Sequence, residues 1–254
     1  MNKYYSSNAL YERLQREGCH DFHWAVGNSW VLLYGDSSPV PRLIVFASGA
    51  SSEELDELGR QRMKATFALA WKLARRAGLP FATIEFDDRS GEISEVSLNK
   101  KIVSLDELKA WFSKFDLAVK GNETGAPLKA INDASSSAYH NWQRSALGRI
   151  TVVDIDLVRI DAITREPMTI YELKRSYIAI DNWSPFRADY RNFDLLAKLA
   201  EMANVRFLIS YNVRHKKPNI YDDVRIIHLF SYSVHTGAES LAVVSFENFV
   251  QEPR

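Results

Sequence analysis

The sequence has a single cysteine, Cys19, among its 254 residues. One thiol excludes an intramolecular disulfide framework and a zinc site made of several thiolates. No apolar run is long enough to span a bilayer, and residues 1–18 have neither the apolar segment of a signal peptide nor the arginine-rich composition of a transit peptide. We therefore expect a cytoplasmic protein with no membrane segment.

The sequence also lacks an excess of charge of either sign, with 32 basic and 32 acidic residues. A protein that coats nucleic acid nonspecifically is clearly basic, so that class is disfavoured. A nucleic-acid enzyme stays possible, because metal-binding carboxylates offset a local basic patch. No glycine-rich phosphate loop and no Ser-His-Asp elbow is present, which disfavours ATP-driven and serine-hydrolase chemistry.

Hydrophobic residues make up 46% of the chain and charged residues 25%, as in ordinary globular proteins. The segment most typical of a linker is KGNETGA, residues 120–126, which Pro127 follows. It predicts an N-terminal α+β domain over residues 1–120 and an α/β domain over residues 126–254. The N-terminal domain would serve recognition, regulation or dimerisation.

Patterns of apolar and turn residues predict the elements of each half. The first half has strands at 30–34 and 43–47, a helix from a Ser51–Glu54 capping box to Gly78, a hairpin at 81–98 and a helix at 104–115. The second half has a helix at 132–147, β-rich runs at 149–160 and 168–174, a helix at 185–203, and strands at 205–213 and 224–230. That order predicts a small sheet with helices on its faces.

Acidic residues interrupt the β-rich runs of the second half. Asp154 and Asp156 are two apart in one apolar run, so we expect both carboxylates to project from the same face of a strand. Glu172 and Lys174 repeat this spacing in the next run. If the two strands pair, the carboxylates and the ammonium converge, and burying them is costly unless they bind a cation or each other. Carboxylate oxygens favour Mg²⁺ or Mn²⁺, which would polarise a phosphate oxygen and lower the pKa of a bound water.

The Asp-Ile-Asp and Glu-Leu-Lys segments, in this order and context, resemble the PD-(D/E)XK nuclease superfamily of restriction-endonuclease-like phosphodiesterases, over residues 132–230. The resemblance implies a mixed central sheet flanked by helices. It also implies that Asp156 and Glu172 bind Mg²⁺ (or Mn²⁺ in its place), that Asp154 is an alternate or extra ligand, and that Lys174 is the catalytic lysine. No proline precedes Asp156. The preceding helix has no acidic residue in its interior, where the polar residues are Tyr139, Asn141 and Gln143.

A second Glu-x-Lys, Glu107 to Lys109, provides a comparison within the same chain. It follows the helix cap Ser104, so we expect it on a solvated helix face. The segment at Glu172 instead ends a β-rich run and precedes a helix. An ordinary ion pair between neighbouring strands is the alternative for that segment.

Basic residues after the Glu-x-Lys segment are candidates for contacts with nucleic acid. They are Arg187 and Arg191 in the helix, and Arg214, Lys216 and Lys217 beyond a strand end; Tyr190 in the helix is a further candidate. Ion pairs with Asp189 or Asp194, and an ordinary basic turn, are the alternatives. Trp183 is expected either to stack on a base or, more commonly, to anchor the core.

The sequence thus predicts a Mg²⁺-dependent endonuclease that hydrolyses DNA phosphodiester bonds in restriction, recombination, repair or mobile-element defence. Cutting both strands with one site per chain favours a homodimer. One alternative is a nuclease for RNA or branched DNA that a protein partner or small ligand controls through the N-terminal domain. Another is a non-catalytic nucleic-acid-binding or assembly protein whose acidic cluster is structural.

Overall fold

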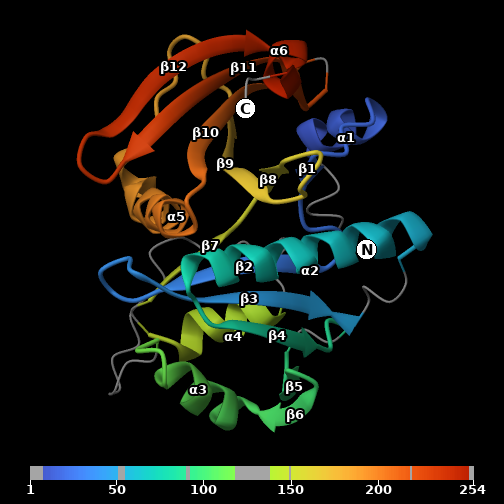
Figure 1. The fold of residues 1–254 in the computed structure, drawn as a ribbon, viewed down its shortest axis with the longest axis vertical. Helices are drawn as coiled ribbons and strands as arrows, with labels where there is room; N and C mark the ends of the chain where they lie inside the picture. Colours follow the sequence, from blue (N-terminus) through green and yellow to red (C-terminus); the bar gives the residue numbers. More distant parts are fainter. Residues whose placement is uncertain are drawn as a thin grey trace.

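The structure is a computed structural model that describes residues 8–50, 55–89, 92–117, 138–148, 150–217 and 219–251. Within these residues the chain is a mixed α/β protein with two six-stranded sheets and helices packed on them (Figure 1). This confirms the predicted α/β class.

The first sheet, sheet A, includes the strands that bear Glu172 and Lys174. Its order is β1 (Phe22–His23), β8 (Leu157–Ile160), β9 (Pro167–Ser176), β10 (Arg206–His215), β11 (Tyr221–Ser233) and β12 (Gly237–Ser245). Strands β9 and β10 are parallel, and helix α5 (Tyr190–Ala203) connects them, whereas the other neighbours are antiparallel. A parallel pair needs such a crossover, because a tight turn can join only antiparallel strands.

The second sheet, sheet B, has the order β6 (Lys101–Ser104), β5 (Glu95–Leu98), β4 (Phe81–Phe86), β3 (Pro41–Gly49), β2 (Ser29–Gly35) and β7 (Thr151–Asp154). Here β3 and β4 are parallel, and helix α2 (Glu57–Ala77) connects them. Each sheet therefore contains one β-α-β crossover.

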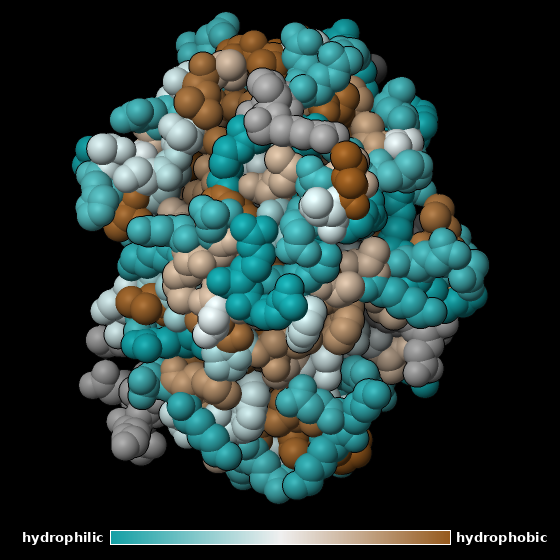
Figure 2. All heavy atoms as spheres, viewed as in Figure 1, coloured by the Kyte–Doolittle hydropathy of each residue, from teal (hydrophilic) through white to brown (hydrophobic). Residues whose placement is uncertain are grey.

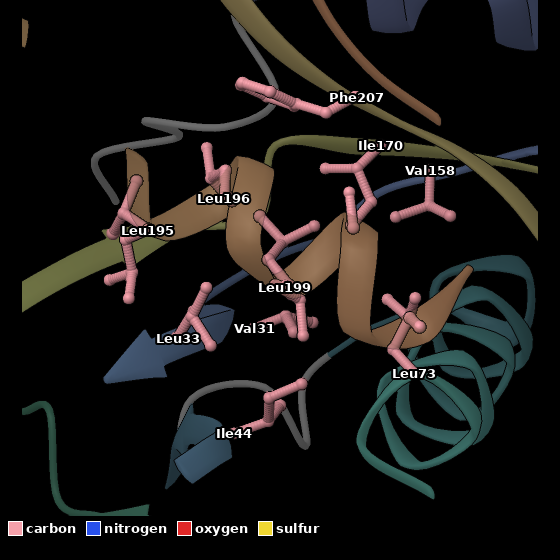
Figure 3. Close-up of a cluster of buried hydrophobic side chains, with 14 of the residues drawn as sticks. Val31, Leu33, Ile44, Leu73, Val158, Ile170, Leu195, Leu196, Leu199 and Phe207 are labelled. Atoms are coloured by element: carbon pink, nitrogen blue, oxygen red, sulfur yellow. The ribbon is translucent and has the colours of Figure 1, made fainter. Parts of the chain in front are cut away.

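The helices and sheets form alternating layers (Figure 1). Helices α2 and α5 lie between the sheets, α1 (Ala9–Arg16) and α6 (Phe246–Gln251) cover the outer face of sheet A, and α3 (Leu105–Ser113) and α4 (Ala138–Ala146) cover the outer face of sheet B. Figure 3 shows Leu195, Leu196 and Leu199 of α5 among side chains from both sheets, such as Val31 and Ile170. One apolar cluster thus joins the two sheets. At about 25 cal/mol per Å² of buried apolar surface, such a cluster is the main stabilising contribution to the fold.

The surface on one side of the molecule is mostly polar. Figure 2 shows hydrophilic side chains over most of this face, with hydrophobic ones in small separate patches. Within the described residues, no helix is both long and apolar enough to cross a membrane.

The expected single strand at 149–160 was wrong. The chain instead forms β7, which pairs with β2 in sheet B, and then β8, which pairs with β9 in sheet A. The break falls at Ile155 and Asp156. The Ile155 N–H donates to the Val31 carbonyl oxygen of sheet B at 2.8 Å, and the Leu173 N–H of sheet A donates to the Asp156 side chain at 2.9 Å. Hydrogen bonds to two different sheets thus end one strand and begin the next.

Each sheet also combines strands from both of the predicted domains. Strand β1 pairs with β8, and β7 pairs with β2, so each sheet contains strands from both sides of residues 120–126. The linker itself lies outside the described residues. The proposed domains 1–120 and 126–254 therefore do not coincide with the two sheets.

The ends of helices α2 and α3 can be compared with those predicted from the sequence. Helix α3 begins with the predicted capping box between Ser104 and Glu107, which confirms that the first Glu-x-Lys is helical. Helix α2 ends at Gly78 in the left-handed conformation (φ 65°), as predicted. It begins later than predicted, at Glu57 with Asp56 as its cap, and residues 51–54 lie outside the described residues.

His23 on β1 gives the fold a testable dependence on pH. Burial, together with the charges of the neighbouring Arg165 and Arg62, lowers the pKa of His23 from 6.5 to about 4. Between about pH 7 and pH 4 the unfolded chain therefore takes up a proton that the folded protein does not, so stability falls as the pH falls. We expect His23→Gln to reduce this fall, measured as the urea midpoint at pH 7 and pH 5. Equal falls in both proteins would contradict the role given to His23.

Candidate active site

Strand β9 carries Glu172 and Lys174 toward α5. Alternate residues of a strand share a face, and Ile170 belongs to the cluster between the sheets, so Glu172 and Lys174 lie on that same side. Glu172 is only 5% exposed. The carboxylate is therefore held inside the protein, whereas the Lys174 side chain stays 21% exposed.

The Lys174 ammonium joins two carboxylates. Its Nζ is 2.9 Å from Glu172 Oε1 and 3.4 Å from Asp189 Oδ2. Asp189 ends a short 3-10 helix, η2 (Arg187–Asp189), directly before α5. The ring of Phe193, one turn into α5, lies 5.2 Å from Nζ and forms the apolar side of the site. Sequence reasoning treated Asp189 only as an ion-pair partner for nearby arginines. Its position at the start of the helix after Glu-x-Lys was the available indication.

Asp156 lies beside Glu172 at the crossing between the sheets. Its Oδ2 accepts the Leu173 N–H at 2.9 Å, and its carbonyl oxygen accepts the hydroxyl of Tyr11 at 2.8 Å. Tyr11 comes from the buried face of α1, far away in the sequence. The side chain of Asp156 is thus held by sheet A, and its backbone carbonyl group is held by α1. No pattern in the sequence indicated this role of Tyr11.

The acidic groups perturb one another. Burial raises the pKa of Asp156 well above its usual range, and the charges of Glu172 and Asp154 raise it further. Burial also raises the pKa of Glu172, although Lys174 opposes the shift. Burial by itself lowers the pKa of Lys174, but Glu172 and Asp189 raise it more, so the net shift is upward. Lys174 is therefore a stable cation at neutral pH, and the carboxylates around it are held at an energetic cost.

Asp154 does not share a face with Asp156, contrary to expectation. It ends β7, opposite Leu32 of β2, and Leu32 belongs to the cluster on the outer face of sheet B. Residues directly opposite in an antiparallel pair lie on the same face, so Asp154 is on that outer face. Its charge still acts on Asp156 and Glu172. The strand break after Asp154 is the physical reason for the difference.

The polar residues of the preceding helix also lie elsewhere. Helix α4 covers the outer face of sheet B, where the Tyr34 hydroxyl is 2.7 Å from the Tyr139 hydroxyl and 2.6 Å from Gln143 Oε1. These groups form a buried hydrogen-bonded cluster. Tyr139 and Gln143 therefore do not complete the site on sheet A.

Of the predicted nucleic-acid contacts in the helix, only Arg187 is exposed. Arg191 donates from Nε to Thr151 Oγ1 and from a terminal nitrogen to the Ser37 carbonyl oxygen, each at 2.7 Å. These bonds tie α5 to sheet B. The Tyr190 ring packs against Tyr232 with centroids 5.3 Å apart. The structure thus gives Arg191 and Tyr190 packing roles.

Arg214 was expected beyond a strand end but lies within β10, which continues to His215, and it is also engaged, whereas Lys216 and Lys217 are exposed. Arg214 donates from Nε to Asp222 Oδ1 at 2.7 Å, and Arg175 contacts the same carboxylate at 2.9 Å. Trp183 is buried and stacks on Tyr211, with centroids 4.1 Å apart, so its core role is confirmed. The exposed cations near the site are therefore Arg187 and the two lysines.

The carboxylates of the site can be compared with the ligands that a divalent metal ion requires. Within the described ranges, no group of three or more His, Cys, Asp or Glu side chains is arranged to hold a metal. Glu172 and Asp156 nevertheless offer two neighbouring carboxylates with raised pKa values. Magnesium is commonly held by one or two carboxylates, with water and substrate phosphate as the other ligands. Asp156 and Glu172 fit that mode of binding and do not form a closed protein site.

Comparisons with known proteins gave no match to a family model, to a curated protein or to a solved structure. The assignment of function therefore depends on the geometry and chemistry of the site itself.

The raised pKa of Asp156 leads to a prediction about stability. Since the folded protein carries this charge at a cost above the folded pKa, Asp156→Asn should stabilise the protein near pH 8. We expect Tm to rise by a few degrees, because about 1 kcal/mol shifts Tm by about 2–4 °C in a chain of this size. The gain should shrink as the pH falls, because the native carboxyl then binds a proton.

The control for this measurement is Asp116→Asn. Asp116 is exposed and has a φ of 58°, a conformation that asparagine adopts readily, so its replacement should leave Tm nearly unchanged. A lower Tm at pH 8 for Asp156→Asn would show that the charge stabilises the fold.

Proposed function

We propose that this protein is a metal-dependent nuclease that hydrolyses DNA phosphodiester bonds. The observation that supports this most directly is the contact of Lys174 with Glu172 and Asp189, on the same sheet face beside Asp156. A partly buried ammonium with several carboxylates is the set of groups that phosphodiester hydrolysis needs: ligands for a hard cation and a positive charge for the reacting phosphate.

Each side chain then has a role that follows from its chemistry. Asp156 and Glu172 would hold Mg²⁺ or Mn²⁺, which supplies charge to polarise the phosphate and to activate water. Lys174 stays protonated, so it binds a phosphate oxygen, orients water by donating hydrogen bonds, and stabilises developing negative charge. Asp189 positions the lysine. Asp154 is the least suited of the predicted ligands, because it lies on the outer face of the other sheet.

The arrangement of sheet A is consistent with the resemblance to PD-(D/E)XK nucleases. Asp156 directly precedes β8, Glu172 lies on the antiparallel β9, α5 follows, and β10 returns parallel to β9. This is a mixed sheet with helices on both faces, as that resemblance implies. A restriction-endonuclease-like core is therefore part of the proposal. A homodimer acting on DNA, with RNA as the alternative substrate, completes it.

A second candidate is a non-catalytic nucleic-acid-binding or assembly protein. It is favoured by one observation: Glu172 already pairs with Lys174, and no three metal-ligating groups are gathered in the part of the chain that the structure describes. In that case the acidic cluster is a buried ion-pair network with a structural purpose only.

Cleavage of supercoiled plasmid and of single-stranded DNA in Mg²⁺, in Mn²⁺ and in chelator tests the nuclease. We expect cleavage that needs the divalent ion and falls by about 10²–10³-fold in Lys174→Ala, the loss typical when one charge-stabilising group is removed. The matched control is Lys109→Ala, which alters the exposed Glu-x-Lys of α3 and should cut like the original protein.

Calorimetry with Mn²⁺ separates the two candidates. The nuclease requires heat of binding that disappears in Glu172→Gln. An absence of both metal binding and cleavage, with Lys174→Ala lowering only stability, would leave the structural role.

A further inference from the structure

Two exposed aromatic residues lie within three positions, in the chain, of the ion-paired residues Lys174 and Asp189, and neither belongs to the predicted site. Tyr177 follows the end of β9 and is 49% exposed, and Phe186 precedes η2 and is 51% exposed. Rings that stay half in water beside a charged site offer flat apolar surfaces on which a planar ligand can stack.

Phe186 is connected to the site on one side. Its carbonyl oxygen accepts the Asp189 N–H at 2.9 Å, so it lies one turn from the carboxylate that contacts Lys174. Its ring meets the ring of Trp183 edge-on, with centroids 6.1 Å apart. Trp183 in turn stacks on Tyr211, which is opposite Lys174 in the register of β9 and β10. The exposed ring therefore rests on a rigid aromatic stack.

Tyr177 is fixed on the other side through its neighbours. The Ser176 hydroxyl is 2.9 Å from the Tyr211 hydroxyl, and Tyr211 donates to the Ile178 carbonyl oxygen at 2.5 Å. These bonds hold the backbone on both sides of Tyr177 while its ring remains exposed. Lys216 Nζ lies 4.5 Å from the centroid of that ring, so a cation accompanies it.

Each of the two rings has an exposed cation near it, through a contact or in the chain. Arg187 directly follows Phe186, and Lys216 contacts Tyr177, with Lys217 next to it in the chain. A nucleic-acid strand has the same alternation, with a planar base and a charged phosphate in each nucleotide. Aromatic rings with basic side chains beside them are the usual means of binding single strands.

We propose that Phe186 and Tyr177 form a stacking platform for a single-stranded segment of nucleic acid that crosses the site at Lys174. This inference rests on the proposed function and specifies its substrate class as single strands or unpaired ends. A duplex hides the faces of its bases within its own stack, so the two rings can contact base faces only where pairing is lost.

Fluorescence anisotropy in chelator tests the platform, because binding is then measured without cleavage. The probes are a labelled oligothymidylate and the duplex that it forms with oligoadenylate. We expect Tyr177→Ala and Phe186→Ala each to raise the Kd for the single strand by about fivefold or more, the lower limit for loss of one stacked base. Tyr177→Phe keeps the ring and should bind like the original protein.

Trp71→Ala is the matched control. Trp71 on α2 is similarly exposed, at 45%, but the neighbouring Lys72 pairs with Glu166 at the opposite end of β9 from Lys174. Its replacement should leave the Kd unchanged. Equal losses in all three alanine variants, undiminished single-strand binding without the rings, or binding of the duplex only would each overturn the platform.

Cleavage in Mg²⁺, measured beside Lys174→Ala, separates this inference from the proposed function. If single strands bind in a way that depends on the rings but are not cleaved, the stacking platform is supported and the proposed nuclease activity is contradicted. If duplex is cleaved in a way that depends on Lys174 and the ring variants cleave it equally well, the nuclease activity is supported and the platform is contradicted.

Discussion

The passage of the chain from one sheet to the other at Ile155 and Asp156 determines where the acidic site can form. Ile155 is hydrogen-bonded to sheet B, and the side chain of the next residue is hydrogen-bonded to sheet A. Tyr11 holds the same peptide from the outer face of sheet A. Helices α2 and α5 fill the space between the sheets. The segment at Ile155 and Asp156 therefore cannot shift without disturbing the packing of both sheets. Asp156 is therefore held next to Glu172 by the packing of the whole molecule.

The charges at this crossing are costly to the fold. Burial opposes the ionised forms of Asp156 and Glu172, and the two carboxylates repel each other. Lys174 compensates only part of this charge, because Asp189 adds a further carboxylate on its other side. Buried ion pairs are often no more stabilising than apolar side chains of the same size. A contribution to fold stability therefore does not explain why these charged residues are buried together. The proposed binding of a cation and a phosphate would explain it.

The parts of the site that depend on local patterns were predictable from sequence. The cap at Ser104 separates the helical Glu-x-Lys from the one in β9, and alternation places Glu172 and Lys174 on one face. The break at Ile155 was not predictable, because residues 150–160 are continuously β-rich, with no glycine or proline to interrupt them. The break arises from long-range pairing.

The positions of several functional candidates were not predictable for the same reason. The contact of Asp189 with Lys174 and the hydroxyl of Tyr11 on Asp156 depend on neighbours far apart in sequence. The bonds from Arg191 to sheet B also follow from tertiary packing, which removes this arginine from the exposed basic residues. A basic side chain near the Glu-x-Lys segment can contact nucleic acid only if it is not already hydrogen-bonded to acceptors within the protein.

The two carboxylates that contact Lys174 differ in what they can do. Glu172 lies on the same strand and beside Asp156, whereas Asp189 lies at the start of α5. Burial raises the pKa of Glu172 and Lys174 opposes the shift, so in the proposed nuclease a divalent ion would compete with a proton and the ammonium for this carboxylate. Asp189 offers the ammonium a second partner at 3.4 Å. In the proposed nuclease, Asp189 would therefore keep Lys174 in place if Glu172 bound a metal ion, and the same lysine would serve the site with and without the ion.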